Sequence, residues 1–242
     1  MQEVTVRRLL DINKQFYQSF GAEFSATRAR IQPGTSMIIN RLEGHEDILD
    51  LGCGNGALAR QLAILGHRGS YTGLDLSLPL LAAAEQQADT FPVNFIQADL
   101  TRTDWDTDLP ADNYQMVFSF ATLHHIPSEQ LRLQILMKIA RLLKKEGKFI
   151  HSNWQFLNSP RLRNRIQPWQ EAVLQAQDVD RGDYLLDWKR GGHGLRYVHH
   201  FDEEELSSLA EAAGFNVCES FHSDGQSGRL GLYQVWDKKI RD

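Results

Sequence analysis

The sequence predicts an α/β fold with a parallel sheet, and three observations support this. Strand-like and helix-like segments alternate from about residue 46 to residue 154, which is typical of parallel strands joined by helical crossovers. A glycine-rich turn, residues 52–56, joins the first of these strands to the helix that follows. The last two strand-like segments, 215–221 and 230–236, flank a turn with Gly225 and Gly228, as in an antiparallel hairpin.

Composition limits the class of protein. A chain of 242 residues is long enough for one large domain, or for a domain with an insertion. The net charge of −5 excludes the uniformly basic surface of small nucleic-acid binders. No apolar run approaches the ~18 residues of a membrane span, and the N-terminus lacks the apolar centre of a secretory signal, so we expect a cytoplasmic protein without membrane contact. The two cysteines, Cys53 and Cys218, cannot form a disulfide framework or a cysteine-rich metal site.

The expected elements follow from local patterns. Strands are expected at 47–51, 70–76, 93–98, 114–121 and 148–154, and helices at 57–65, 79–88, 128–143 and 202–213. Ser128 is the expected N-cap of the third helix and Gly147 its stop, and Gly214 is the expected C-cap of the fourth.

The chain is expected to have three parts. Residues 1–43 look helical and precede the sheet. Residues 155–200 are polar and rich in Arg and Trp, and we expect them to be an insertion that covers the site, partly helical around 168–177. The remaining residues, 44–154 and 201–242, form the predicted core.

Acidic residues end two successive predicted strands after the glycine turn. Ligands of parallel α/β sheets bind at the carboxyl ends of the strands. Asp75 at the second strand end can accept both ribose hydroxyls of an adenosine, and Asp99 at the third can receive an adenine amino group. The alternatives are a plain turn and loop-capping carboxylates, and the joint occurrence of these features favours the ligand site.

These segments resemble the class I S-adenosylmethionine (SAM)-dependent methyltransferases: DLGCGNG matches their glycine motif, TGLDLS their acidic second strand end and QADL their third. The resemblance implies a Rossmann-like, seven-stranded, mostly parallel sheet with a reversed last strand and helices on both faces. It implies SAM as cofactor, with the glycines near its methionine part and Phe118 and Ala121 near its sulfonium end. The implied cofactor-binding residues are Asp50, Gly52, Gly54, Gly56, Asp75, Leu76, Asp99, Leu100, Phe118 and Ala121.

The segment after the fourth strand is ATLHHI, without the Asn/Asp-Pro-Pro-Tyr/Phe motif of the methylases that modify base amino groups. His124 and His125 are placed where this strand end meets the site. We expect His124 to contact substrate or cofactor, with a hydrogen bond to the loop as the alternative. A His pair without further ligands does not indicate a metal.

A second resemblance extends into the insertion. The segments GDYLLDWK at 182–189 and RYVHHF at 196–201, followed by Glu205-Leu206, and the early pair Thr27-Arg28 resemble the tRNA wobble-uridine carboxymethyl methyltransferase family. The chain departs from the family pattern at Asp187, where a proline is expected, in a shorter linker between the two segments, and in having both His199 and His200.

The resemblance implies that a carboxylate on a modified uridine is esterified. A carboxylate is already nucleophilic at neutral pH, so alignment matters more than a base. Arg28, Lys189 and Arg196 are candidates to bind it, or are ordinary surface charges. Trp188 or Tyr197 is expected to stack on a base, with a core role as the alternative for Trp188, and Asp183 is expected to position a cation or a substrate hydroxyl.

The distribution of charge agrees with an anionic substrate. Residues 1–34 carry a net +2, residues 155–200 also +2, and the rest of the chain −9. Arg161, Arg163 and Arg165 are candidates to meet phosphates, or form a solvated face. Eukaryotic members of the resembled family work with a small zinc-binding partner, and the sequence of this chain shows no docking surface for one.

Three other functions are alternatives to this one. One is methylation of a small-molecule carboxylate, phenol or amine, and another is a non-catalytic binding module with the same fold. A closed pocket favours a small molecule, and an open basic rim favours tRNA. The third, a NAD-dependent dehydrogenase, is disfavoured by the G-x-G-x-G spacing at residues 52–56.

Overall fold

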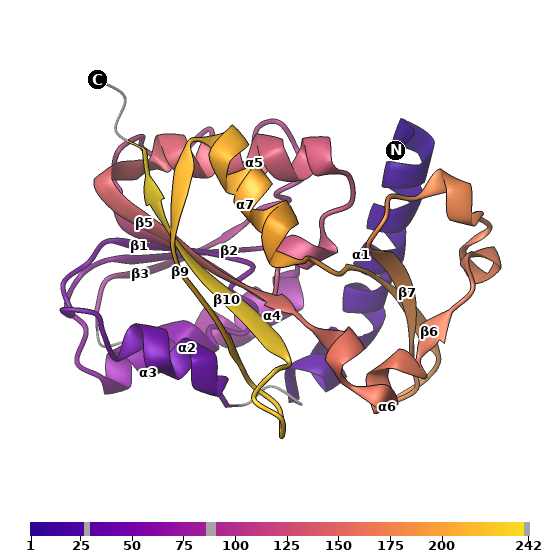
Figure 1. The fold of residues 1–242 in the computed structure, drawn as a ribbon. Coiled ribbons are helices and arrows are strands. Elements are labelled where there is room, and N and C mark those ends of the chain that lie inside the picture. The colour runs from indigo at the N-terminus through magenta and orange to yellow at the C-terminus, as the bar shows by residue number, and fades with distance from the viewer. Residues whose placement is uncertain (27–29, 86–90, 240–242) are drawn as a thin grey trace.

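The computed structural model describes residues 1–26, 30–85 and 91–239, which form a seven-stranded sheet between helices and a smaller sheet beside it (Figure 1). The large sheet has the order β3-β2-β1-β4-β5-β10-β9. Its strands are β1 (Ile48–Leu51), β2 (Tyr71–Asp75), β3 (Val93–Gln97), β4 (Tyr114–Phe120), β5 (Leu143–Trp154), β9 (Phe215–Ser223) and β10 (Gly231–Lys238). Only β10 runs against its neighbours β5 and β9. The predicted mostly parallel sheet with a reversed last strand is confirmed.

Helices cover both faces of this sheet, as predicted. Figure 1 shows α5 (Glu129–Leu142) and α7 (Glu203–Ala213) on one face, and α2 (Pro33–Ile39), α3 (Ala57–Ile64) and α4 (Leu78–Glu85) on the other. The central strand β1 is buried along its whole length, because helices cover it on both sides. Asp202 caps α7 by accepting the N–H of Glu205, and Gly214 ends this helix with a φ of 86°.

The end of α5 differs from the prediction. The helix stops at Leu142, and Leu143 is already extended and pairs with Tyr114 of β4, so Gly147 lies inside β5 instead of ending the helix. Ser128 occupies the N-cap position of α5 without a side-chain capping bond.

Residues 155–200 form a three-stranded antiparallel sheet with short helical turns around it. Its strands are β6 (Ile166–Gln167), β7 (Asp183–Trp188) and β8 (Gly194–His199), in that order. The helical turns are η2 (Phe156–Asn158), α6 (Pro160–Arg163), η3 (Trp169–Ala172) and η4 (Ala176–Asp178). The helical character expected around 168–177 is limited to single turns, and the sequence patterns did not indicate the strands.

The long helix α1 (Glu3–Ala26) lies between the two sheets (Figure 1). Leu9 and Ile12 pack with Leu185 and Tyr197 of the small sheet, which fixes one side of α1 against the insertion. Another part of α1 faces the carboxyl ends of the core strands. The boundaries of the three predicted parts stay predictions. Within the described ranges, no helix combines the length and apolar character needed to cross a membrane.

Candidate cofactor and substrate site

A cavity of about 650 Å³ lies at the carboxyl ends of β1 to β4. Its floor consists of the residues that follow these strands, and one of its walls is α1. The volume is typical of a site for a small molecule or cofactor. Residues 155–200, all of which the structure describes, contribute none of its lining side chains, so α1 covers the site where the sequence predicted the insertion.

The glycine turn leaves the backbone open to this cavity. Gly52 and Gly54 line it with φ angles of 78° and 56°, which side chains rarely adopt. A Cβ at Gly52 would lie 2.2 Å from Oγ1 of Thr122, whereas a Cβ at Gly54 would meet no atom within 4 Å. Gly56 does not line the cavity, since it begins α3, where a Cβ would lie 2.8 Å from that of Ala84. Its role is therefore to let α3 pack on α4.

Two carboxylates stand at neighbouring strand ends in the cavity lining. Oδ2 of Asp75 accepts the N–H of Gly54 at 2.9 Å, and its Oδ1 accepts the N–H of Ser77 at 2.8 Å. Burial raises the pKa of Asp75, although these N–H groups act in the opposite direction. Oδ1 of Asp99 accepts the N–H and the hydroxyl of Thr101 at 3.0 and 2.6 Å. A carboxylate has about four acceptor sites, so each of the two retains capacity for the hydroxyl and amino groups of an adenosine.

Asp50 is the third carboxylate of the floor and the most deeply buried, with 4% of its surface exposed. Burial raises its pKa to about 7, the hydroxyl of Tyr71 lowers it by donating at 2.6 Å, and nearby Asp75 raises it. An acidic floor of this kind fits SAM, which carries a positive sulfonium and a positive ammonium group. Leu76 and Leu100 add apolar lining beside the carboxylates.

The end of β4 reaches the cavity through Phe120 and Ala121. Ala121 has a φ of 54°, which turns the chain at the strand end. Phe118 is a correction to the sequence prediction. It lies two residues before the strand end, has no exposed surface, and belongs to the buried cluster under α2 and α3 rather than to the lining.

The histidine at the cavity is His125, not His124. Both lie in the helical turn η1 (Leu123–His125), but His124 is 1% exposed and its Nδ1 accepts the N–H of Trp154 at 3.3 Å. Nδ1 of His125 lies 3.1 Å from the carbonyl oxygen of Tyr197, which can only accept, so this nitrogen carries a proton. Nε2 lies 2.9 Å from the hydroxyl of Tyr17. His125 is therefore held by hydrogen bonds at both ring nitrogens.

The wall opposite the floor is basic. Arg7 and Lys14 of α1 and Arg30 of the following loop line the cavity and are exposed. Among the described lining residues of this wall, Asp11 is the single carboxylate. Positions 7, 11, 14 and 18 fall on one face of a helix because of its 3.6-residue period, and this spacing is the signal that sequence inspection missed. The cavity thus has an acidic side and a basic side.

Comparison with known proteins agrees with this arrangement. Residues 48–147 match the family model described as a methyltransferase domain. Residues 48–147 form a class I, SAM-dependent methyltransferase domain. SAM is its cofactor, and the matched range includes the glycine turn, Asp75 and Asp99.

Two relatives align with most of the methyltransferase chain. A protein of Encephalitozoon cuniculi, named only as a methyltransferase, is 28% identical over 204 residues, which cover 84% of this chain and 86% of the relative. A tRNA (carboxymethyluridine(34)-5-O)-methyltransferase of Schizosaccharomyces pombe is 23% identical over 215 residues, 85% and 89% of the two chains.

Solved structures share the fold. A methyltransferase of Haloferax volcanii, determined in complex with the Trm112 methyltransferase activator, aligns with a TM-score of 0.67 and 17% identity over 96% of this chain and 99% of that chain.

The residues predicted to hold the substrate of the methyltransferase have mainly structural contacts. Trp188 packs edge-on against Phe16, with ring centroids 5.5 Å apart, and Arg196 lies 4.8 Å from the ring centre of Trp154. Lys189 is exposed and paired with Asp187 at 3.0 Å. Within the described part of the chain, the cavity lining includes none of Asp183, Trp188, Lys189, Arg196 and Tyr197. Arg28 lies outside the described residues.

Asn13 of α1 connects Tyr197 of the insertion to His125 at the cavity. The Nδ2 of Asn13 donates to the carbonyl of His125 at 3.2 Å, and its Oδ1 accepts the N–H of Tyr197 at 2.9 Å. Because the carbonyl of the same Tyr197 accepts a hydrogen bond from His125, the three elements α1, η1 and β8 form a closed set of hydrogen bonds. The insertion thus acts on the site by holding α1 and His125 in place.

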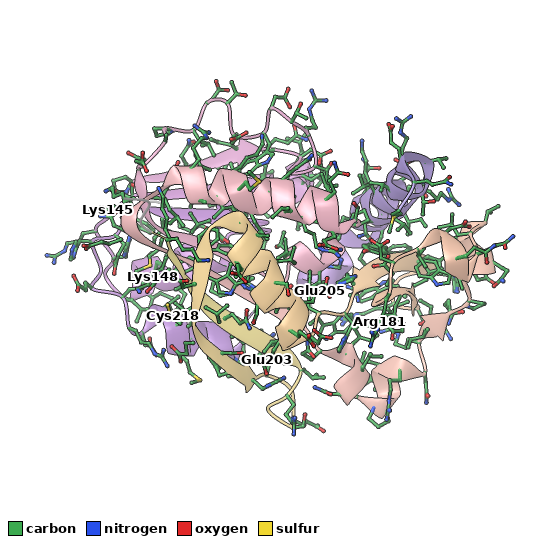
Figure 2. All side chains as sticks on the ribbon, turned by 45° about the horizontal axis from the view of Figure 1, so that its top comes forward. Lys145, Lys148, Arg181, Glu203, Glu205 and Cys218 are labelled. Carbon is green, nitrogen blue, oxygen red and sulfur yellow. The ribbon has the colours of Figure 1, made fainter. Side chains whose placement is uncertain are left out.

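A buried network joins the insertion to the core. His199 lies between Oδ1 of Asp183, at 2.6 Å, and the carboxylate of Glu205, at 2.9 Å, and Glu205 accepts from Arg132 at 3.2 Å. Figure 2 labels Glu205 on α7, where that helix meets the insertion. Burial lowers the pKa of His199, but the hydrogen bonds to Asp183 and Glu205 outweigh burial and raise it overall. The Tyr197 hydroxyl donates to Asp183 at 2.7 Å, so both predicted residues belong to this network.

Proposed function

We propose that this methyltransferase transfers the methyl group of SAM to the carboxylate of a modified uridine at the wobble position of tRNA. The observation that carries the proposal is the separation of charge in the cavity. Asp50, Asp75 and Asp99 suit the cationic cofactor on one side, and Lys14 and its basic neighbours on α1 suit an anionic acceptor on the other.

In methyl transfer to a carboxylate, the main task of the protein is to orient the two reactants. SAM supplies the methyl group, and its transfer to a carboxylate oxygen gives a methyl ester and S-adenosylhomocysteine without release of a proton. His125 agrees with such an acceptor because both of its ring nitrogens are engaged, by Tyr197 and by Tyr17, so it is not poised to remove a proton. The cations of α1 would hold the acceptor carboxylate in line with the methyl group.

Three further observations support a tRNA substrate. The relative from Schizosaccharomyces pombe is named for this reaction. The segments 182–189 and 196–201 resemble that family, and the basic wall of the cavity is exposed, as an RNA substrate requires. The Haloferax volcanii structure contains the Trm112 activator, and we include a small activating protein of this kind in the proposal. A cytoplasmic location stays a prediction.

A small-molecule carboxylate is the second candidate acceptor. The net charge of −5 favours it, because RNA-binding proteins generally carry a basic surplus. The same cavity and the same cations would serve both acceptors, so the experiment must present both.

Mass spectrometry of tRNA nucleosides from a strain without the gene tests the proposal. We expect the methyl ester of 5-carboxymethyluridine to disappear and the free acid to accumulate. An unchanged nucleoside profile would exclude the tRNA substrate, and transfer by the purified enzyme to small carboxylates alone would favour the second candidate.

The cation wall is tested in the purified enzyme with Lys14→Gln. We expect the KM for the anionic acceptor to rise about twofold to fivefold, the equivalent of ~0.5–1 kcal/mol for an exposed charge pair, with unchanged SAM affinity. Lys145→Gln is the matched control, since Lys145 is exposed at the end of the core far from the insertion (Figure 2). Equal KM values for the two variants would contradict the assigned role of α1.

A further inference from the structure

We infer that a second cavity, between α1 and β8, binds a nucleobase next to the acceptor uridine; this inference rests on the proposed tRNA substrate. The cavity measures about 350 Å³ and is lined by Phe16, Phe20, Arg8 and His193 among others. We refer to it as the α1–β8 cavity. None of the residues that the sequence predicted as site residues lines it.

The position of this cavity suits an RNA strand that continues from the cofactor site. The α1 residues that line it are 8, 12, 15, 16, 19 and 20, whereas 7, 10, 11, 13, 14, 17 and 18 line the cofactor cavity. At about 100° per residue, these two sets point to roughly opposite sides of the helix. A single helix, about 10 Å in diameter, therefore separates the two cavities. Neighbouring bases of a single-stranded loop are commonly splayed apart and bound in separate pockets.

The partly exposed ring of Phe20 gives the α1–β8 cavity its aromatic surface, and the buried ring of Phe16 lies next to it. The ring centroids of Phe16 and Phe20 are 5.7 Å apart. The glycine-rich loop before β8 lies directly against Phe20: a Cβ at Gly192 or Gly194 would come within 2.9 or 2.6 Å of its ring. This contact holds the ring in place from one side, and Trp188 packs against Phe16. Fixed aromatic rings are the surfaces on which unpaired bases stack.

Polar groups complete the cavity and give it a positive character. Nε of Arg8 donates to the carbonyl of Ala172 at 3.1 Å, and a guanidinium has five N–H donors in total. Among the described residues, the lining contains Arg8 and His193 and no acidic side chain. Beside Trp188, Asp187 pairs with both Arg165 and Lys189, so two cations share one carboxylate. This surplus favours a nucleotide over an acidic peptide or a neutral ligand.

The test compares two substrates of the holoenzyme, an anticodon stem-loop that carries 5-carboxymethyluridine and the free nucleoside. The readout is the ratio of kcat/KM for the stem-loop to kcat/KM for the nucleoside, because only the stem-loop has a neighbouring base. We expect Phe20→Leu to lower this ratio about 5- to 150-fold through the KM for the stem-loop, the range that corresponds to one lost base–aromatic stack. Phe20→Trp, which keeps an aromatic face, should retain most of the wild-type ratio.

A second readout reports binding without catalysis. A stem-loop with 2-aminopurine beside the acceptor uridine should lose fluorescence on binding to the wild type and retain it with Phe20→Leu, since stacking quenches this base. Val4→Ala is the matched control, because Val4 is an exposed apolar residue of α1 that lines neither cavity. Thermal melting of each variant checks that it folds.

The outcomes separate the two proposals. Methyl transfer to the stem-loop by the wild type, with the same ratio and the same quenching in Phe20→Leu, would overturn the α1–β8 site and leave the proposed function intact. Failure of the wild type to methylate either substrate would overturn the proposed function, and the site with it.

Discussion

Asp75 is the single residue through which the cofactor assignment is most directly tested. It lies in the cavity floor and already accepts two backbone N–H groups, those of Gly54 and Ser77. Asp75→Ala should weaken SAM binding by about 1–3 kcal/mol, because both these N–H groups and the ribose hydroxyls would lose an acceptor. Isothermal titration calorimetry with SAM measures this change.

The control for this substitution is Asp108→Ala, an exposed carboxylate that does not line the cavity. Its SAM affinity should equal that of the wild type. If Asp75→Ala bound SAM as tightly as this control, the end of β2 would not be the ribose site.

The raised pKa of Asp50 leads to a prediction of how cofactor binding depends on pH. Burial raises its pKa to about 7, so below pH 7 the free protein holds this carboxyl protonated and neutral. A cationic cofactor beside it favours the ionised form. SAM affinity should therefore increase as pH rises from about 6 to 7.5 and level off above that range, and binding near pH 7 should release protons. Titrations in buffers of different ionisation enthalpy measure the protons released.

Asp50→Asn removes the titrating group, and its SAM affinity should be lower at high pH and nearly constant over the same range. A wild-type affinity that falls with rising pH would contradict this assignment, because it would require the neutral carboxyl to be the binding form.

Single residues also show what a sequence can predict about this site. Gly52, Gly54, Asp75 and Asp99 could be found because each lies at the end of a strand or just after it, and parallel strands end at the same edge. The choice of His124 over His125 could not be made in this way. Adjacent residues of a helical turn point in different directions, and only the contacts with Tyr17 and Tyr197 distinguish them.

At the scale of elements, the position of α1 at the site was the feature that the sequence predicted least well. Its helical character was predictable, but its position depends on contacts with β8, which is more than 150 residues away in the chain. Strands β7 and β8 were missed because their buried residues include Asp183, Asp187, Arg196 and His199. Asp183 bonds to His199, and Asp187 pairs with Arg165 and Lys189. Such polar side chains interrupt the apolar pattern that indicates a strand.

Asn13 tests the connection between α1 and the site. Both ends of its buried amide are used, one by His125 and the other by Tyr197. Asn13→Ala should destabilise the protein by about 1–3 kcal/mol, since it leaves a buried N–H and a carbonyl without partners. For a chain of this size, that corresponds to a fall in Tm of about 2–4 °C per kcal/mol. Differential scanning calorimetry measures the change.

Methyl transfer by Asn13→Ala should also be slower at saturating SAM, because α1 and His125 lose their alignment. Gln18→Ala, a change at an exposed residue of α1 that also lines the cofactor cavity, should retain the wild-type Tm. Matching melting curves for Asn13→Ala and Gln18→Ala would show that the hydrogen bonds of Asn13 contribute nothing measurable to stability.

At the scale of the whole molecule, basic side chains are found at both cavities although the net charge is negative. The protein is acidic overall, yet Arg7, Lys14 and Arg30 line the outer wall of the cofactor cavity, and Arg8 lines the α1–β8 cavity. The segment charges of the sequence indicated this concentration, since residues 1–34 and 155–200 are the two positive parts. The individual cations could not be assigned, because the fold determines which of them face a cavity.

The network around His199 connects the insertion to the core and makes the stability of the whole molecule depend on pH. Asp183 and Glu205 face the two ring nitrogens, and Arg132 contacts Glu205 from α5. The folded protein raises the pKa of His199 above its ordinary value of 6.5. The stabilisation by this imidazolium is therefore fully present below about pH 6.5 and is lost as pH rises through the folded-state pKa.

We predict that the difference in Tm between the wild type and His199→Gln is largest below pH 6.5 and decreases steadily toward pH 9. His222→Gln, a change at an exposed histidine of β9, should leave the Tm close to that of the wild type at each pH. Calorimetric melts across this range measure the difference, and NMR titration of the His199 ring locates its pKa. A difference that stays constant or grows with pH would mean that His199 is neutral in the folded protein.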